Sequence, residues 1–399
     1  MRTAPSRAGL PPVAVSAGML ATAMAVATFP QFLFGAVAPF LLEAYGLTRS
    51  ALGGLTTVVF GTAVLLSPAM GAASARMGPR AGYSVLLLVP VAAALGFGMS
   101  TVYLHLIACA ALAGIALALS NPVTNQLIPA LVAERWRGLV IGIKQSGVQM
   151  GAMVVGVTLP LLVVTVGWRA ALFGVAGFML LAWAGFLPVI PPAYEQDRQA
   201  GTGAHHTGSG RSQVLALAGF AFVMGSAMAA VMNYLPLYAF ETVGVDERLA
   251  GSLLSVLAIT GISSRIVIGH LATRASSPVR VLTAIAAVGL AGLVLLLAAP
   301  TVSPALLWIG ALVFGCNLSW SSVAMLAVVD SRQINTARGS AHVMMGFYAG
   351  FILVPPGFGH VVDLTGSYTL PWVALTVLMG VTALVTLLVA RRSHASPSA

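Results

Sequence analysis

Two long basic side chains lie inside apolar stretches of the chain, and neither has an acidic partner nearby in the sequence. Lys144, the only lysine, lies within GLVIGIKQSGVQMG, and Arg265 lies within LAITGISSRIVIGH. All nine Asp and Glu residues fall in loops or at the ends of apolar stretches. Buried cations normally pair with carboxylates, so these two cations predict a site that binds an anion. Arginine offers a planar fork that suits a carboxylate, and lysine offers a movable point charge.

The depth of the two cations in a membrane follows from their distance to the nearest polar loop. Lys144 is seven residues beyond Arg137, and Arg265 is nine residues before Arg274, which corresponds to about 10 Å and about 13 Å along a helix. The apolar half-thickness of a bilayer is about 15 Å. The alternative interpretation is a structural role, in which the side chains extend to the headgroups. That reach would exceed the length of either side chain.

Neutral polar side chains in the same kind of apolar stretch could hold the oxygens of an anion. Gln31 and Asn233 lie close to prolines, and a proline inside a membrane helix bends it and frees a backbone carbonyl. Asn121 and Asn125 are four residues apart, so they share one helix face. Hydrogen bonding between helices is the alternative role for all of these groups. The predicted substrate-binding residues are Lys144, Arg265, Gln31, Asn121, Asn125, Asn233, Tyr234, Asn317 and Trp320.

The composition assigns these residues to a membrane protein. The chain is 59% hydrophobic and only 7% charged, and its mean hydropathy is +0.98, whereas soluble domains carry about 25% charged residues. A membrane-spanning helix needs about 20 mostly apolar residues. Breaks at charges, Gly and Pro predict an all-α membrane protein with twelve transmembrane helices, over residues 13–42, 49–74, 81–99, 103–131, 138–163, 168–190, 213–240, 249–272, 279–299, 304–329, 339–362 and 369–390.

The arginines predict on which side of the membrane each loop lies. When the loops are assigned alternately to two sides, fourteen arginines share a side with both termini, and only Arg49, Arg169 and Arg248 lie on the other. Positively charged loops face the cytoplasm. We therefore expect a multi-pass protein of the cell (inner) membrane with both termini in the cytoplasm. The net charge of +10 is then a topology signal, and no nucleic-acid partner is predicted.

A polar, glycine-rich stretch divides the predicted spans into two sets of six. This stretch, PPAYEQDRQAGTGAHHTGSGRSQ, has no apolar period and predicts a flexible linker. The expected domains are a six-helix bundle over 1–190, a cytoplasmic linker over 191–212 and a second six-helix bundle over 213–399. Short patterns recur in the same order in both halves, as in GAASARMGPR and GHLATRASSPVR. The two bundles are therefore expected to be pseudo-symmetric.

Six plus six spans, a central linker and a Gly/Arg loop after the second and eighth spans resemble the major facilitator superfamily, over the whole chain. The family's best-known loop motif follows the second span. Ala75 stands where the family usually has an aspartate, so the usual charge-relay bond of this gating loop lacks its acid. The gating-loop residues implied by the resemblance, with the equivalent arginine of the second half, are Gly71, Arg76, Gly78, Arg80 and Arg274.

The resemblance also implies a transport mechanism. Family members carry small solutes by rocking two halves around a midplane site, and spans five and eight, which hold Lys144 and Arg265, face each other across the halves. The charges resemble those of oxalate–formate exchangers and monocarboxylate carriers, in which an arginine of span eight helps to hold the substrate carboxylate. Arg265 matches by span and depth. The membrane lysine of oxalate carriers is on span eleven, whereas Lys144 is on span five, which leaves the exact substrate open.

We therefore predict a secondary active transporter that moves a small organic anion, with a carboxylate as the expected class, by alternating access. The alternative is efflux of a drug or other solute by the same fold, but proton-coupled drug exporters have a membrane acid on an early span and a Gly-Pro motif on span five, and these spans of the chain lack both. An enzyme is not predicted, since no nucleophile, base or metal cluster gathers at a membrane face. No cofactor is expected. The expected partners are membrane lipid, a small anionic solute and a coupled proton or exchanged anion, and the expected state is a monomer.

Overall fold

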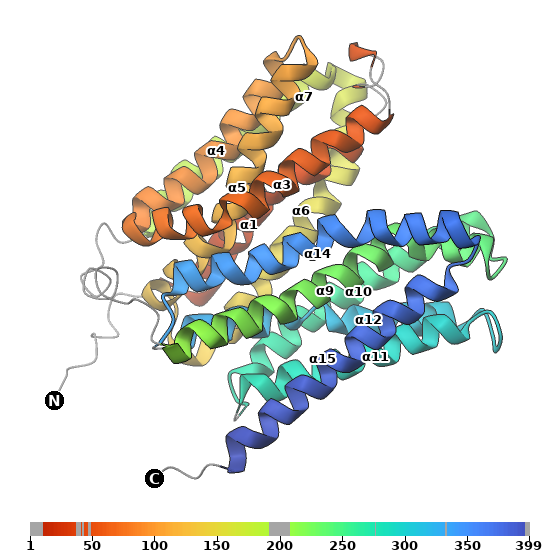
Figure 1. The fold of residues 1–399 in the computed structure, drawn as a ribbon. Coiled ribbons are helices and arrows are strands. Elements are labelled where there is room, and N and C mark those ends of the chain that lie inside the picture. Colours follow the sequence, from red (N-terminus) through yellow and green to blue (C-terminus); the bar gives the residue numbers. More distant parts are fainter. Residues whose placement is uncertain are drawn as a thin grey trace. The chain divides into compact units, whose positions relative to one another are not determined.

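The regular structure of the described chain is helical. The computed structural model describes residues 11–36, 41, 44–46, 49–190, 208–275, 277–331 and 333–395. Two short 3-10 helices, Glu134–Trp136 and Leu187–Val189, accompany the α-helices. The α-helices (Figure 1) are α1 (Val13–Ala36), α3 (Arg49–Arg76), α4 (Pro79–Met99), α5 (Tyr103–Leu131), α6 (Arg137–Val166), α7 (Trp168–Phe186), α9 (Gly208–Glu241), α10 (Glu247–Ala272), α11 (Pro278–Ala298), α12 (Leu306–Asn317), α13 (Trp320–Asp330), α14 (Thr336–Thr365) and α15 (Thr369–Ala395).

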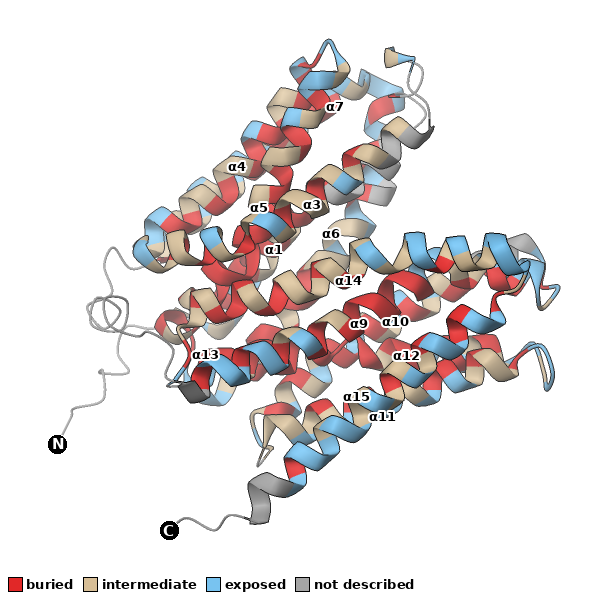
Figure 2. Cartoon of the chain, viewed as in Figure 1, coloured by how far each residue is buried: buried red, intermediate tan, exposed pale blue. Residues whose placement is uncertain are grey.

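Twelve helical stretches of the described chain are long and apolar enough to cross a membrane. They correspond to the twelve predicted spans, so the all-α membrane fold class is confirmed. The chain is thus a multi-pass membrane protein. An exposed apolar stripe on α15 fits this environment, because Val377, Val381, Leu384 and Leu388 recur at helical spacing and are each about half exposed. Figure 2 shows such exposed positions along α15.

The tenth span differs from the prediction of one unbroken helix over 304–329. The structure divides it into α12 and α13, with Leu318 and Ser319 between them. At this break the Ser319 N–H donates to the Cys316 carbonyl, and the Ser319 Oγ donates to the same carbonyl. Serine side chains that bond nearby backbone carbonyls compete with α-helical bonding. The apolar length predicted the span correctly, but it carried no signal for this local competition.

The chain forms two compact units, which we describe separately. Unit 1 comprises residues 1–214 and 328–345, and unit 2 comprises residues 215–327 and 346–399. Residues 191–207, most of the predicted linker, lie outside the described residues. The 328–345 segment, which holds the last three residues of α13 and the first ten of α14, therefore packs with the helices of the first half.

Helix pairs recur between the two units. In unit 1, α5 packs on α3 and α4, and α4 packs on α7. In unit 2, α12 packs on α10 and α11, and α11 packs on α15 (Figure 1). These are the same pairs when the spans of each half are counted in order. The sequence repeats thus correspond to a repeated packing arrangement.

Glycines four residues apart bring two helices together in each unit. Gly147 and Gly151 of α6 lie against α1, where a Cβ added to Gly147 would collide with the backbone carbonyl of Ala21. Gly346 and Gly350 of α14 lie against α9 in the same manner. Small residues at this spacing allow membrane helices to approach closely. The close approach of α6 to α1 fixes the orientation of the α6 side chains that face α5.

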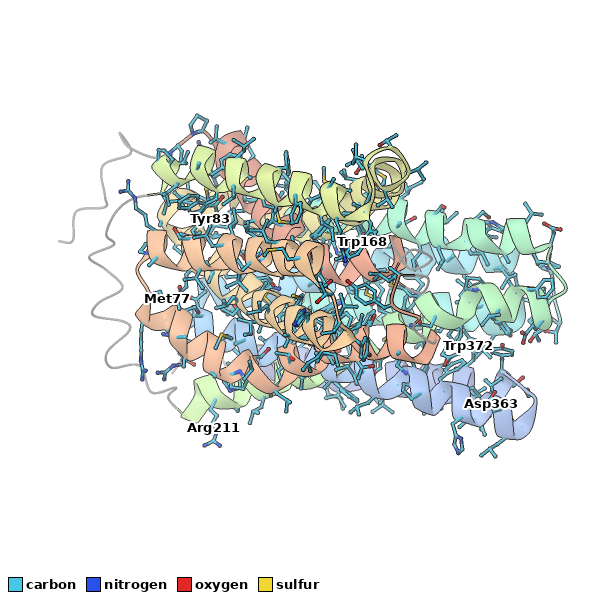
Figure 3. The ribbon with its side chains drawn as sticks, turned by 90° about the horizontal axis from the view of Figure 1, so that it is seen from above. Met77, Tyr83, Trp168, Arg211, Asp363 and Trp372 are labelled. Atoms are coloured by element: carbon cyan, nitrogen blue, oxygen red, sulfur yellow. The ribbon has the colours of Figure 1, made fainter. Side chains whose placement is uncertain are left out.

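Aromatic side chains join three helices at one end of unit 2. Figure 3 shows Asp363 near the end of α14 and Trp372 near the beginning of α15. The Trp372 ring lies 5.8 Å from Tyr238 of α9 and 5.1 Å from Phe358 of α14, measured between ring centroids. Tilted and edge-to-face aromatic pairs of this kind add to the packing energy. They hold α9, α14 and α15 together.

Candidate functional site

Lys144 is completely buried in unit 1 and donates three hydrogen bonds to α5. Its Nζ lies 3.1 Å from Asn121 Oδ1, 3.0 Å from Thr124 Oγ1 and 2.6 Å from Asn125 Oδ1. An ammonium group has three protons, and each of them has an acceptor here. All three acceptors are neutral, so they solvate the positive charge of Lys144 but do not neutralise it.

The spacing on α5 creates this oxygen cluster. Asn121, Thr124 and Asn125 stand at i, i+3 and i+4, which places them on one face of the helix. Gln145, next to Lys144 on α6, donates from Nε2 to Asn121 Oδ1 at 3.0 Å. Since two donors converge on that oxygen, the orientation of the Asn121 amide is fixed. The structure thus brings Lys144, Asn121 and Asn125 together, and adds Thr124, which the sequence analysis did not select.

No described carboxylate pairs with Lys144. The ion pair in the described part of the chain joins Arg137 and Asp330. A carboxylate 4 Å from an ammonium gains about 4 kcal/mol at an effective dielectric constant of about 20. The Lys144 site therefore favours an added negative charge.

Arg265 is the buried cation in the described part of unit 2, with 5% of its surface exposed. Its Nε donates to the Leu318 carbonyl at 3.0 Å, and this carbonyl lies in the break between α12 and α13. Beside it, the Ser264 Oγ donates to the Gly315 carbonyl at 3.3 Å. The break and the last turn of α12 therefore provide backbone acceptors to which α10 attaches, and the Leu318 carbonyl orients the guanidinium group.

One nitrogen of Arg265 has no fixed partner. Its Nη1 is buried and makes no hydrogen bond among the described residues. A buried donor without an acceptor costs about 1–3 kcal/mol, and more when the group is charged. An oxyanion beside Nη1 would remove that penalty. Lys144 lies in unit 1 and Arg265 lies in unit 2. The anion-binding site that the sequence predicts for both residues therefore remains a prediction.

Two other predicted residues, Asn317 and Trp320, flank the same break. The Asn317 amide packs on Gly289 of α11, and its Oδ1 has no hydrogen bond within the described chain. The Trp320 ring lies between Phe220 and Phe347, at 6.4 Å and 5.5 Å between ring centroids. Both residues are buried. Trp320 is thus part of an aromatic cluster that packs directly after the Arg265 acceptor.

Asn233 and Tyr234 on α9 make their hydrogen bonds to backbone carbonyls. Asn233 is exposed, and its Nδ2 donates to the Ala229 carbonyl of the same helix at 2.7 Å. The Tyr234 hydroxyl donates to the Pro355 carbonyl of α14 at 2.6 Å, and its ring stacks on Phe358. Neither of these hydrogen bonds connects Asn233 or Tyr234 to Arg265. Gln31 lies on α1, but its side chain is outside the described residues.

The gating-loop residues have different surroundings within the described chain. Gly71 of α3 packs against α14, where an added Cβ would lie 2.5 Å from the Ala341 Cβ. Arg80 donates from Nε to the Ile190 carbonyl at 2.8 Å. Arg76 ends α3 and Arg274 lies in the turn after α10, and both are exposed, while Gly78 precedes α4 in an extended conformation. Gly71 is thus the member of this set that contacts the 328–345 segment directly.

Sequence reasoning missed the two polar bonds that hold the 328–345 segment in unit 1. Asn125 Nδ2 donates to Ser340 Oγ at 2.8 Å, and Arg137 Nη1 pairs with Asp330 Oδ1 at 2.7 Å. The partners are far apart in the sequence, and serine carries no charge pattern that would mark it. The one available signal was Asp330 itself, an acid at a span end in a loop otherwise rich in arginine.

Comparison with known families and proteins identifies similar chains over nearly the whole length. The family model described as Major Facilitator Superfamily matches residues 20–341. A probable sulfoacetate transporter, SauU, from Cupriavidus necator is 25% identical, and the match covers 93% of this chain and 92% of that protein.

Solved transporter structures have a similar fold. The fucose:proton symporter FucP of E. coli superposes with a TM-score of 0.75 at 16% identity, over 94% of this chain and 98% of that chain. The proton:xylose symporter XylE superposes with a TM-score of 0.70 at 14% identity, over 93% and 94% of the two chains. At these identities the similarity establishes the fold alone.

Proposed function

Since the chain belongs to the Major Facilitator Superfamily and is a secondary transporter, we propose that it carries a small organic anion with a carboxylate or sulfonate group. Alternating access is the proposed route. The observation that carries this proposal is the presence of two buried cations, Lys144 and Arg265, without a described carboxylate partner.

In the absence of substrate, the two buried cations cost free energy. A basic residue at the centre of a membrane helix costs at least about 2.5–3.5 kcal/mol. A protein that only needed stability would place an apolar residue there, since apolar replacements of buried charges are often neutral or stabilising. A visiting anion supplies the missing charge. We therefore assign both cations to substrate binding.

The two cations would hold an anion in different ways. Arg265 is oriented by the Leu318 carbonyl and has Nη1 left over, so an oxyanion can bond to it without breaking an existing bond. Lys144 already uses its three protons, so an anion oxygen has to replace one neutral acceptor on α5. That exchange is favourable because a charged acceptor bonds an ammonium more strongly than an amide or hydroxyl does.

The relative from Cupriavidus necator supports an organic anion and suggests which one to test first. That protein is named a probable transporter of sulfoacetate, a molecule with one carboxylate and one sulfonate. Two anionic ends match two cations, so we propose sulfoacetate or a similarly short dianion as the first candidate. The coupled species is proposed to be a proton or an exchanged anion, because the described carboxylates lie at span ends or in loops.

Membrane orientation and oligomeric state are also proposed from the sequence. Both termini are proposed to lie in the cytoplasm, as the arginine distribution indicates. A monomer is proposed as the working state. Drug or other solute efflux by the same fold is the competing function, and it predicts that neutral or cationic solutes move while short anions do not.

An uptake panel in proteoliposomes tests the proposal. Radiolabelled sulfoacetate, malonate and acetate are compared with glycolamide, which is neutral, and tetramethylammonium, which is cationic. We expect uptake of at least one anion and of neither control.

Lys144→Gln and Arg265→Gln should each reduce that uptake at least about tenfold, as expected for loss of a charged hydrogen bond. Arg211→Gln, at an exposed arginine (Figure 3), is the matched control and should transport normally. Normal transport by both buried variants would contradict the proposal.

A further inference from the structure

In the described chain, two side-chain bonds link the 328–345 segment to α5 and α6, and they differ in exposure. Arg137 and Asp330 form an ion pair whose side chains are 20% and 38% exposed. Asn125 and Ser340, which share the other bond, are completely buried. Exposed ion pairs contribute little because water and salt screen them. A buried bond is more demanding, since breaking it leaves unsatisfied polar groups. Breaking the Asn125–Ser340 bond should therefore cost more free energy than breaking the Arg137–Asp330 pair.

Asn125 uses both ends of its side-chain amide. Its Oδ1 accepts the shortest of the three Lys144 bonds, at 2.6 Å, and its Nδ2 donates to Ser340 Oγ at 2.8 Å. The amide is planar, so a rotation that changes one bond changes the other as well. Lys144 on α6 and Ser340 on α14 are thus connected through one side chain on α5.

Asn121 provides an internal comparison. Its Oδ1 also accepts a bond from Lys144, and it is shared with Gln145 rather than with the 328–345 segment. Both asparagines are buried and both stabilise the ammonium group. They differ in their second partner, since Asn125 bonds to Ser340 whereas Asn121 bonds to Gln145.

We propose that Asn125 is the positioning residue that couples anion binding at Lys144 to release of the 328–345 segment. This inference rests on the proposed function. An anion that takes over a proton of Lys144 displaces the Asn125 oxygen, since that oxygen and the anion compete for the same donor. The displaced amide turns and weakens its bond to Ser340. The segment then remains attached through the partly exposed Arg137–Asp330 pair and the packing at Gly71 and Gly210.

Amide hydrogen exchange of the full-length protein measures this coupling. Mass spectrometry follows the peptide over 328–345 with and without the panel anion that the wild type accumulates most. In the wild type we expect the anion to accelerate exchange of this peptide by about fivefold, the effect of losing one typical hydrogen bond. In Asn125→Ala, exchange is fast without the anion and does not increase when the anion is added.

Two further variants make the result specific. Asn121→Ala also removes one acceptor from Lys144, but it should keep the anion-dependent acceleration because its Asn125–Ser340 bond is intact. Ser340→Ala removes the same bond from the other side. It should reproduce the fast, anion-independent exchange, and because coupling is reciprocal the Kd for the anion, measured by calorimetry, should fall by up to about fivefold.

The outcomes separate this inference from the proposed function. If the wild type binds none of the panel anions, the proposed function fails and the coupling fails with it. If the wild type binds an anion but Asn125→Ala and Ser340→Ala both keep the full acceleration, the coupling alone is overturned. Equal loss of acceleration in Asn121→Ala and Asn125→Ala would also overturn it, since a general disturbance of Lys144 would then be the cause.

Discussion

Lys144 and Arg265 present two different forms of buried positive charge. The Lys144 ammonium has three neutral acceptors, so its hydrogen bonds are complete while its charge is not balanced. The Arg265 guanidinium is held at Nε and has a buried Nη1 without a partner in the described chain. Arg265 is therefore ready to receive an oxyanion, whereas Lys144 has to exchange a partner. We therefore expect anion binding to depend more on the side-chain shape of Arg265 than on that of Lys144.

Replacing Arg265 by lysine tests whether shape matters. The charge is kept, but the planar fork and the Nε donor to Leu318 are lost. We expect the KM for the transported anion to rise about tenfold or more, as for loss of one charged hydrogen bond. Arg211→Lys, at an exposed arginine of α9, is the control and should leave the KM unchanged. A KM for Arg265→Lys within about twofold of the wild type would mean that charge alone is required.

At the residue scale, the sequence predicted the cations better than their partners. Lys144 and Arg265 stood out because long apolar stretches around them contain no acid. Asn121 and Asn125 were predicted from their shared face, and the same spacing rule would also have selected Thr124. Ser340 could not be predicted, because its bond to Asn125 depends on how α14 packs beside α5.

At the scale of helices, close packing at glycines positions the Lys144 cluster. Gly147 is three residues after Lys144 on α6, and it lies directly on the backbone of α1 at Ala21. A larger residue there would push α6 away from α1 and shift the Lys144 amine relative to its acceptors on α5. Gly174 of α7 is exposed, and a Cβ added to it would meet no atom within 4 Å.

Gly147→Leu and Gly174→Leu form a matched pair for this contact. Overpacking a close contact typically destabilises by about 1–3 kcal/mol. We expect Gly147→Leu to lower the thermal unfolding midpoint of the detergent-solubilised protein and to reduce transport, and we expect Gly174→Leu to change neither. Equal midpoints for the two variants would show that the α1–α6 contact does not limit stability.

The helices themselves were largely predictable, and the break in the tenth span was not. Hydropathy marks where a helix crosses the membrane, since nearly every residue of a span is apolar. Hydropathy does not reveal a place where a side chain bonds a backbone carbonyl and interrupts the helix, as Ser319 does at Cys316. That break is nevertheless functional in our proposal, because it provides the Leu318 carbonyl that orients Arg265.

At the scale of the whole molecule, the two units have a repeated helix packing, and the described part of each holds one buried cation. The repeat was visible in the loop patterns, and the recurring helix pairs match it. The clustering of the 328–345 segment with unit 1 was not predicted, because helix order along the chain assigns it to the second half. Which side of the membrane each loop faces is still a prediction from the arginines.

The most direct test of the central claim is calorimetric titration of the purified protein with the accumulated anion. Wild type should bind it, and it should not bind glycolamide. Lys144→Gln and Arg265→Gln should each raise the Kd at least about tenfold, equivalent to about 1.4 kcal/mol, and the double variant should bind no measurable anion. A double variant that binds the anion as tightly as wild type would contradict the claim that these two buried cations form the substrate site.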